Sequence, residues 1–144
     1  MKKFDLSSWP ILIVSDKINA LSDEGCWLQE LIKQLETQQD CSIIMSVTYS
    51  DAVDIVYSRE DLGAILIDWD LKSIGRGHSK TIMKSNRFAN AADPQNKSAA
   101  NLLAFIRERN KQIPVLLMID RGSVEDIPDE IFTRINDTVW KLTD

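Results

Sequence analysis

Charged side chains stand directly after several short apolar runs of this sequence, at positions where they could act together. Asp16 follows the run at 11–14, Asp68 follows the run at 64–67, and Lys141 lies near the end of the chain. If the runs are strands of one parallel sheet, their carboxyl ends meet at one edge, where such sheets bind ligands. Carboxylates gathered there can bind a cation, and a lysine can pair with a carboxylate or with an anionic ligand. These three residues are therefore the candidate site.

The same three residues resemble the core of a response-regulator receiver domain, which has a metal-binding acid, a phosphoacceptor aspartate and a lysine. Residues 65–70, which read ILIDWD, are similar to the receiver strand that carries the acceptor. The resemblance implies Mg²⁺ between the carboxylates of Asp16 and Asp68, and transfer of a phosphoryl group to Asp68. Lys141 would take the part of the receiver lysine.

Three departures from the receiver pattern weaken this interpretation. Ser15 stands where receivers have a second acid, the run before Asp120 ends without their threonine or serine, and Lys141 is not followed by their usual proline. We therefore expect no working phosphoacceptor. The alternative is that Asp16 and Asp68 are solvated carboxylates at strand ends, as most acidic side chains in proteins are.

Other catalytic and metal-binding motifs are missing from the sequence. It contains no phosphate-binding Gly-rich loop, no GxGxxG, no GxSxG and no recognisable Ser-His-Asp set. Two cysteines, Cys26 and Cys41, and one histidine, His78, cannot make a zinc site of known spacing. We expect both cysteines to be reduced, mostly buried thiols. The sequence predicts no catalytic, cofactor-binding or metal-binding residue.

Predicted strands and helices, which must position these side chains, alternate along the chain, whose length is that of a single domain. The 144 residues are 44% hydrophobic and 27% charged, which is typical of a globular domain. Short apolar runs alternate with helical patterns that begin at capping residues. We expect strands at 11–14, 42–47, 64–67, 114–119 and 138–142, and helices beginning at Ser22, at Ser50, at Ser98 and at Pro128, the last running through Ile131 and Ile135.

This alternation predicts an α/β fold with a doubly wound, five-stranded parallel sheet in the flavodoxin-like (response-regulator-like) order 2-1-3-4-5. Such a sheet normally has a further helix over its last strand, and no residues remain for that helix after Leu142. We therefore expect the final helix to be truncated and the chain to continue in a longer protein. The apolar surface beside Val139 and Leu142 would then favour self-association.

Basic residues are concentrated in one segment of an otherwise acidic chain. The net charge is −5, but the segment at 72–97 carries +5 and the remainder −10. This insertion supplies four candidates for contact with an anion or another subunit: Arg76, Lys80, Lys84 and Arg87. If residues 79–92 are helical, the last three form one stripe that suits an acidic subunit face or an anionic nucleotide. The alternative is a solvated insertion with no partner.

Charge and hydropathy also disfavour two classes of partner. The net negative charge argues against general nucleic-acid binding. No apolar run approaches the ~20 residues needed to cross a bilayer, and the first residues lack the pattern of a secretion signal. We expect a cytoplasmic protein with neither a nucleic-acid nor a membrane partner.

Several motifs occur together in an order that resembles one enzyme family. They are ILIDWDL at 65–71, IPVLL at 113–117, DIP at 126–128 and TVWKLTD at 138–144. This set is similar to the N-terminal wing domain of bacterial ornithine/lysine/arginine decarboxylases, although Lys141 and Thr143 depart from the family's closing strand. The resemblance covers nearly the whole chain apart from residues 72–97. On this interpretation residues 1–144 are one receiver-like wing domain, the N-terminal fragment of a much larger enzyme.

The resemblance implies a function for the parent protein rather than for these residues alone. The family's enzymes are cytoplasmic, depend on pyridoxal phosphate (PLP) in a fold type I domain, and remove CO₂ from a basic amino acid. The wing domain binds no cofactor itself; it contacts the rest of the enzyme and neighbouring subunits, and helps to build dimers into decamers. In some relatives the alarmone ppGpp binds near it. The alternatives are a receiver or pseudo-receiver signalling domain, or an unrelated flavodoxin-like binding module.

Overall fold

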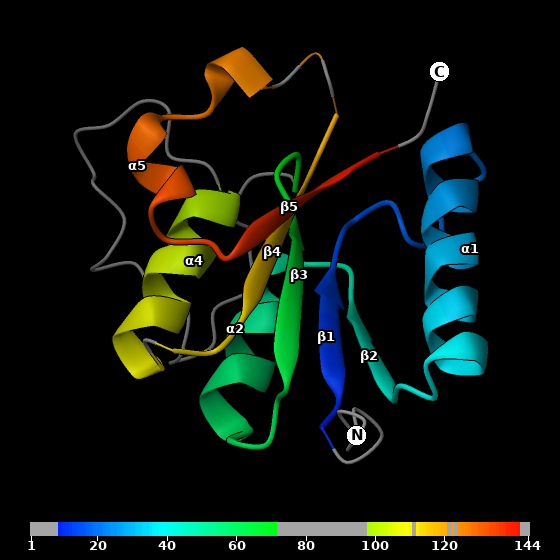
Figure 1. Cartoon of the computed structure of the whole chain (residues 1–144), viewed down its shortest axis with the longest axis horizontal. Helices are drawn as coiled ribbons and strands as arrows, with labels where there is room; N and C mark the ends of the chain where they lie inside the picture. Colours follow the sequence, from blue (N-terminus) through cyan, green and yellow to red (C-terminus); the bar gives the residue numbers. More distant parts are fainter. Residues whose placement is uncertain (1–8, 72–97, 111, 121, 123, 142–144) are drawn as a thin grey trace, which may run out of the picture.

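Five short strands form one parallel sheet in the computed structural model of the chain (Figure 1). The strands are β1 (Ile11–Val14), β2 (Ile43–Ser46), β3 (Ala64–Asp68), β4 (Val115–Ile119) and β5 (Asp137–Trp140). Their spatial order is β2-β1-β3-β4-β5, and every neighbouring pair is parallel. This confirms the predicted flavodoxin-like sheet. The structure describes residues 9–71, 98–110, 112–120, 122 and 124–141.

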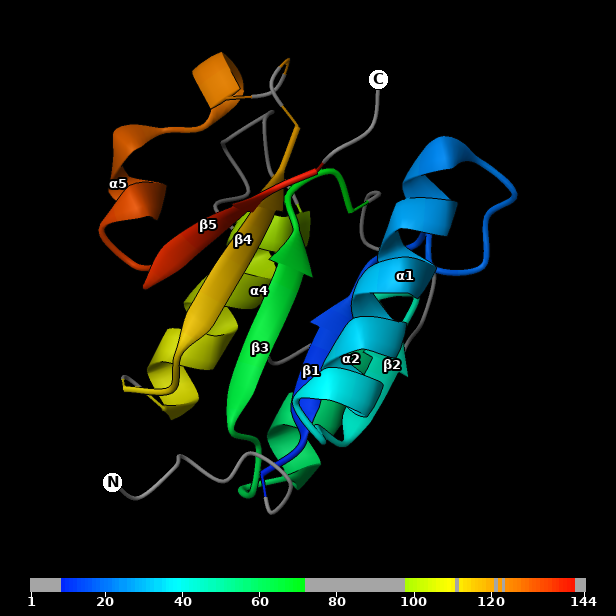
Figure 2. The same ribbon diagram turned by 45° about the vertical axis from the view of Figure 1, so that its right-hand side comes forward.

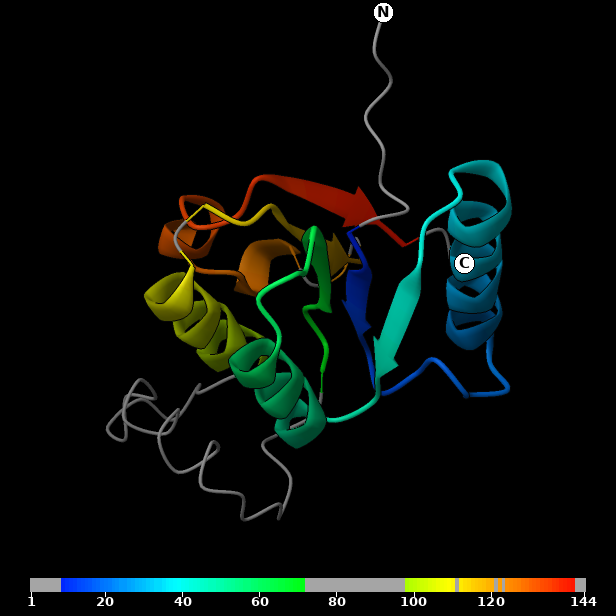
Figure 3. The ribbon, with the colours of Figure 1, turned by 90° about the horizontal axis from the view of Figure 1, so that it is seen from below.

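Helices lie on both faces of this sheet. The helix α1 (Asp23–Gln38) covers one face, and α2 (Tyr49–Ser58) and α4 (Ser98–Arg109) cover the other (Figure 3). Two short turns, η2 (Val124–Asp126) and α5 (Asp129–Phe132), precede β5. With 16 residues, α1 is the longest described helix and remains shorter than the ~20 residues of a bilayer-spanning helix.

Strand side chains alternate between two apolar clusters, one on each face of the sheet. Leu12 and Val14 of β1 pack in the cluster with α2 and α4, whereas Ile11 and Ile13 pack in the cluster with α1. All four residues of β1 are buried, because the strand lies between β2 and β3 and both of its faces pack in these clusters. The parallel register carries Val14 opposite Ile67. The segments that follow β1 and β3 therefore leave the sheet side by side.

Capping side chains set where the first two helices begin. The Ser22 Oγ accepts a hydrogen bond from the Gly25 N–H at 3.1 Å, which confirms the predicted start of α1. The next helix begins at Tyr49 rather than at Ser50. The reason is that Thr48 supplies the cap, with its hydroxyl oxygen accepting from the Asp51 N–H at 3.0 Å.

The C-terminal elements are shorter than predicted. The helix α5 ends at Phe132 and does not reach Ile135, because the Asn136 N–H already donates to the Val115 carbonyl at 2.8 Å and so joins the sheet. The strand β5 ends at Trp140, so the prediction that Lys141 lies within it was wrong by one residue. The Lys141 N–H still donates to the Ile119 carbonyl at 2.9 Å, which holds this residue against the end of β4.

The two cysteines differ in their surroundings. Cys41 is buried, as predicted, and burial raises the pKa of its thiol. Cys26 is exposed, so the prediction that it is buried was wrong. It lies on α1, whose buried residues are Gly25, Leu28 and Ile32, and it stands outside that stripe.

Candidate functional site

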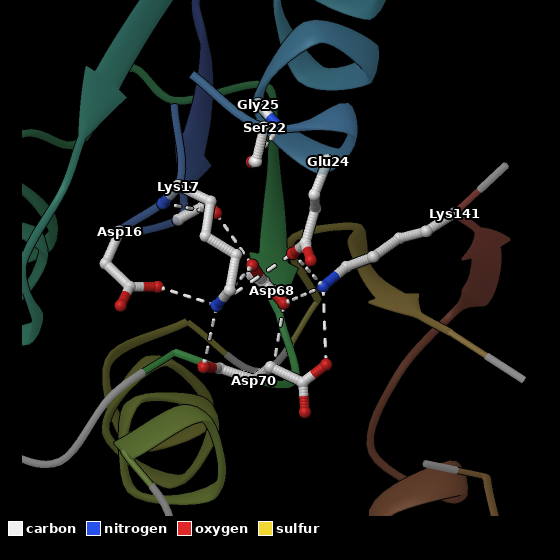
Figure 4. Close-up of polar contacts among 9 residues, drawn as sticks. Asp16, Lys17, Ser22, Glu24, Gly25, Asp68, Asp70 and Lys141 are labelled. Atoms are coloured by element: carbon white, nitrogen blue, oxygen red, sulfur yellow. Dashed lines mark hydrogen bonds and ion pairs between the residues drawn. The ribbon is translucent and has the colours of Figure 1, made fainter. Parts of the chain in front are cut away.

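The three predicted site residues meet at the carboxyl edge of the sheet (Figure 4). Asp68 is the last residue of β3, Asp16 follows β1 by two positions, and Lys141 directly follows β5. Figure 4 shows that Lys17, Glu24 and Asp70, which the sequence analysis did not single out, point toward the same spot. We call these six charged residues, with the hydroxyl of Ser15, the ion-pair cluster.

Asp68 is the centre of the ion-pair cluster. Its side chain is fully buried, and its Oδ1 accepts from the Lys141 ammonium at 2.6 Å and from the Asp70 N–H at 2.9 Å. Its Oδ2 accepts from the buried Ser15 hydroxyl at 2.7 Å and lies 3.6 Å from the Lys17 ammonium. The alternative that Asp68 is a solvated carboxylate was therefore wrong. A carboxylate removed from water needs charged and hydrogen-bonding partners, and Asp68 has both.

Lys141 bridges three carboxylates from a buried position. Besides Asp68, its ammonium lies 2.7 Å from the Glu24 carboxylate and 3.4 Å from that of Asp70. Burial on its own would lower the pKa of Lys141. The negative charge of Asp68, together with hydrogen bonds to Asp68 and Glu24, outweighs burial and raises this pKa well above the usual lysine range. Lys141 is therefore charged inside the fold at neutral pH.

Lys17 is a second cation in the ion-pair cluster. Its ammonium donates to the Asp16 carboxylate at 3.0 Å and to the main-chain carbonyl of Asp70 at 3.1 Å. It also lies 3.9 Å from the Glu24 carboxylate. Burial opposes the charge of Lys17, but Asp68 and the hydrogen bond to Asp16 prevail and raise its pKa. Asp16 is partly exposed, so of the two strand-end acids it is the one that keeps contact with water while also pairing with Lys17.

Sequence reasoning missed Lys17, Glu24 and Asp70 for different reasons. Lys17 could have been predicted, because it is adjacent to Asp16 and its long side chain can reach the same edge of the sheet. Asp70 stands two positions after Asp68, where the chain turns back in a short bend closed by the Leu71 N–H and the Asp68 carbonyl. Glu24 lies in the first turn of α1, where an acid is expected for helix-dipole reasons alone, so its contact with Lys141 had no local signal.

The charges of the ion-pair cluster do not cancel. Four carboxylates surround two ammonium groups, so the cluster has a formal charge of −2. Glu24 and Asp70 are partly exposed at its rim, whereas Asp68 and Lys141 are buried. The buried centre of the cluster therefore pairs a carboxylate with an ammonium group. The surplus negative charge lies at the rim, where water can screen it.

This geometry favours ion pairing over phosphoryl transfer. An acceptor aspartate must present an oxygen to the phosphoryl donor, and both oxygens of Asp68 already have partners within the fold. The space between Asp16, Asp68 and the Asp70 carbonyl is taken by the ammonium of Lys17. Within the residues that the structure describes, no group of three or more His, Cys, Asp or Glu side chains is arranged to hold a metal ion.

Arg76, Lys80, Lys84 and Arg87 lie outside the described residues, as does the whole segment at 72–97. The contact role predicted for them stays a prediction.

One family model matches most of the chain. It is described as the N-terminal domain of Orn/Lys/Arg decarboxylase, and it matches residues 24–144. The segment with Ser15, Asp16 and Lys17 precedes the matched residues. None of the curated proteins matches the chain.

Solved structures with this fold include lysine decarboxylases and receiver domains. Lysine decarboxylase A from Pseudomonas aeruginosa is 18% identical with a TM-score of 0.66, and the match covers 95% of this chain and 16% of that one. The lysine decarboxylase of Francisella novicida is 12% identical with a TM-score of 0.61, covering 94% and 15%. A CheY-like response regulator receiver domain from Methanospirillum hungatei JF-1 is 12% identical with a TM-score of 0.61, covering 96% and 85%. At these identities the likeness shows the fold, and this chain spans about one sixth of either decarboxylase.

Proposed function

The chain belongs to the family of Orn/Lys/Arg decarboxylase N-terminal domains, and we propose that it serves as the non-catalytic assembly and regulatory domain of a PLP-dependent decarboxylase of basic amino acids. The family match over residues 24–144 is the observation that carries this proposal. The ion-pair cluster supports it, because its central carboxylate is committed to contacts within the fold. The proposed parent is a cytoplasmic homo-oligomer.

Neither lysine of the ion-pair cluster suits PLP. The cofactor is held as a Schiff base, which forms only from an unprotonated lysine amine. Lys141 is buried and kept protonated by Asp68 and Glu24, and the Lys17 ammonium is held by Asp16 and the Asp70 carbonyl. The proposal therefore places the cofactor and the decarboxylation chemistry in another part of the parent enzyme.

Partly buried apolar side chains support a longer parent. Leu116 of β4 and Val139 of β5 pack at the margin of the α1-side cluster. Figure 2 shows α1 over β1 and β2, with no described helix over the same face of β4 and β5. We propose that a helix following β5 in the parent covers these side chains. Contact of Arg76, Lys80, Lys84 and Arg87 with a neighbouring subunit, or with ppGpp, remains part of the proposal.

Removing this domain from the parent enzyme tests the assembly role. We expect the parent without residues 1–144 to form smaller oligomers in sedimentation velocity, because the subunit contacts of the domain are lost. Its visible absorption from PLP and its decarboxylation per active site should be retained, and the isolated 144-residue chain should show neither. An unchanged oligomer size, or turnover by the isolated chain, contradicts the proposal.

A receiver-type signalling domain is the second candidate, because Asp68 and Lys141 are paired as in the receiver resemblance. Beryllofluoride with Mg²⁺ mimics a phosphoryl group on an acceptor aspartate. We expect no change in the fluorescence of Trp69, which is next to Asp68 and buried, because both Asp68 oxygens have partners. A receiver domain treated in the same way is the positive control. A fluorescence change that Asp68→Asn abolishes would favour the signalling function.

A further inference from the structure

The strand β2 forms one edge of the sheet, and its sequence lacks the features that usually protect such an edge. Within the described residues no strand pairs with its outer side, and Figure 1 shows it as the last strand on that side of the sheet. Protected edges carry charged side chains, proline or a bulge, which hinder pairing with another chain. Residues 41–48 contain neither a charged residue nor proline, and β2 keeps an unbroken register with β1. The strand at the opposite edge, β5, begins with the exposed Asp137.

Hydrogen bonds to β1 show which main-chain groups of β2 face outward. The Ser42 carbonyl accepts from the Ile11 N–H at 2.9 Å, and the Ser46 carbonyl accepts from the Ser15 N–H at 3.0 Å. Successive residues of a strand direct their main-chain groups to alternate neighbours, so the even-numbered residues of β2 face β1. The N–H and C=O groups that point away from the sheet therefore belong to the odd-numbered residues, Ile43, Met45 and Val47.

The side chains of these three residues are apolar, and two of them are exposed. Met45 is 49% exposed and Val47 is 38% exposed, whereas Ile43 packs at the margin of the α1-side cluster. Ile13 of β1 pairs with Met45 and is fully buried in the same cluster. Met45 therefore continues the α1 face of the sheet beyond β1, at a position that a further strand would cover.

We propose that β2 pairs in antiparallel fashion with β2 of a second copy of this chain, with Met45 on the two-fold axis. In this register Met45 exchanges main-chain hydrogen bonds with its own counterpart in the second copy, and Ile43 of each copy exchanges them with Val47 of the other. Every outward N–H and C=O group of these three residues then has a partner. Directly opposite residues point to the same face, so their apolar side chains also meet one another.

A second copy suits this edge because a two-fold contact needs a surface that is complementary to itself. The alternating residues Ile43, Met45 and Val47 present an apolar pattern that is the same in both directions along the strand. Each chain has a net charge of −5, which opposes association of two copies in general. The uncharged segment at 41–48 is a place where two acidic chains can meet without placing like charges opposite each other.

This inference gives the proposed assembly function one definite surface, but it is argued from the β2 edge and not from the family match. The two can therefore fail separately. A monomeric 144-residue chain overturns the inference and leaves assembly to other surfaces of the parent. An unchanged oligomer after removal of residues 1–144 contradicts the assembly role and leaves the pairing of the isolated chain untouched.

Sedimentation equilibrium of the 144-residue chain tests the pairing. We expect a monomer–dimer equilibrium whose Kd rises at least tenfold in Met45→Lys, because two lysines then stand directly opposite each other. Trp140→Lys is the matched control, since Trp140 is 45% exposed on the strand at the other edge of the sheet, and its Kd should be that of the unaltered chain. A chain that stays monomeric, or a dimer that Met45→Lys weakens no more than Trp140→Lys does, overturns the inference.

Disulfide cross-linking tests the register. The Cα atoms of a hydrogen-bonded antiparallel pair are about 5.5 Å apart, which is within the range of a disulfide. Met45→Cys, combined with Cys26→Ser to remove the exposed thiol, should therefore give a covalent dimer on mild oxidation. Trp140→Cys in the same background should cross-link much more slowly. Equal rates for these two variants would show that the copies meet elsewhere, and would overturn the inference.

Discussion

Replacing Lys141 with methionine is expected to lower the free energy of unfolding by roughly 3 kcal/mol, because it leaves a buried carboxylate without its main cation. The Lys141 ammonium lies 2.6 Å from Asp68 and 2.7 Å from Glu24, and the side chains of Lys141 and Asp68 are fully buried. Methionine preserves most of the volume, so the loss reports charge rather than packing. Lys17 remains 3.6 Å from Asp68, so the expected loss of stability is at the lower end of the range for a broken buried ion pair. Urea unfolding followed by tryptophan fluorescence measures the difference.

Two comparisons isolate the ion pair in this experiment. Lys33→Met removes an exposed lysine and should change stability by less than about 0.5 kcal/mol. Asp68→Asn combined with Lys141→Met should be more stable than Lys141→Met alone, because the amide carries no buried charge. If Lys141→Met costs no more than Lys33→Met, the ion pair is not what stabilises this edge of the sheet.

The same pair gives a pH dependence whose sign is fixed by the raised pKa of Lys141. A cation with a higher pKa in the folded state than in the unfolded state stabilises the fold fully below its unfolded pKa. The stability difference between the unaltered chain and Lys141→Met should therefore stay constant from neutral pH to the ordinary lysine pKa of 10.5, and shrink at more alkaline pH.

Replacing Gly25 with alanine is expected to destabilise the fold by roughly 2–3 kcal/mol through overpacking. Gly25 is buried in the first turn of α1, and a Cβ there would collide with the carbonyl oxygen of Ala20 and lie 2.9 Å from that of Lys17. Alanine favours a helix by about 1 kcal/mol over glycine, so the measured loss is net of that gain. The clash pushes away the turn closed by the Ala20 N–H and the Lys17 carbonyl, which also carries the Lys17 side chain.

Gly122→Ala is the matched control for this variant. A Cβ at Gly122 would meet its nearest atom, a carboxylate oxygen of Asp120, at an ordinary 3.4 Å. Its effect on thermal unfolding should stay within about 0.5 kcal/mol. A Gly25→Ala variant as stable as Gly122→Ala would contradict this prediction, because it would show that the loop before α1 shifts to accommodate the added Cβ without loss of stability.

The sheet was predictable because its three central strands, β1, β3 and β4, are short apolar runs that are mostly buried on both faces. A run such as 11–14 contains no polar residue, and alternation with amphipathic helices leaves few arrangements other than a doubly wound parallel sheet. Boundaries were less predictable where a single hydrogen bond decides them. The cap at Thr48 moved the start of α2, and the bond between Asn136 and Val115 ended the helical turn before Ile135.

The candidate site was predictable in position but not in environment. Asp16, Asp68 and Lys141 follow strands, and the carboxyl ends of parallel strands lie at one edge of the sheet regardless of loop conformation. Whether Asp68 is solvated depends on Ser15, Lys17 and Lys141, which reach it from two other loops. Such long-range contacts leave no trace in local periodicity, so the alternative of a solvated carboxylate could not be rejected from the sequence.

The bond between Lys141 and Glu24 links residues that are 117 positions apart, which has a consequence for the order of events during synthesis. The growing chain exposes Glu24, Asp68 and Asp70 long before the ribosome releases their shared cation. Until then the Asp68 carboxylate at the end of β3 lacks its closest cation, which disfavours its burial. Folds with many contacts of long sequence separation fold more slowly than folds with local contacts. Full pairing of the Asp68 carboxylate at the end of β3 therefore requires the residue that directly follows β5.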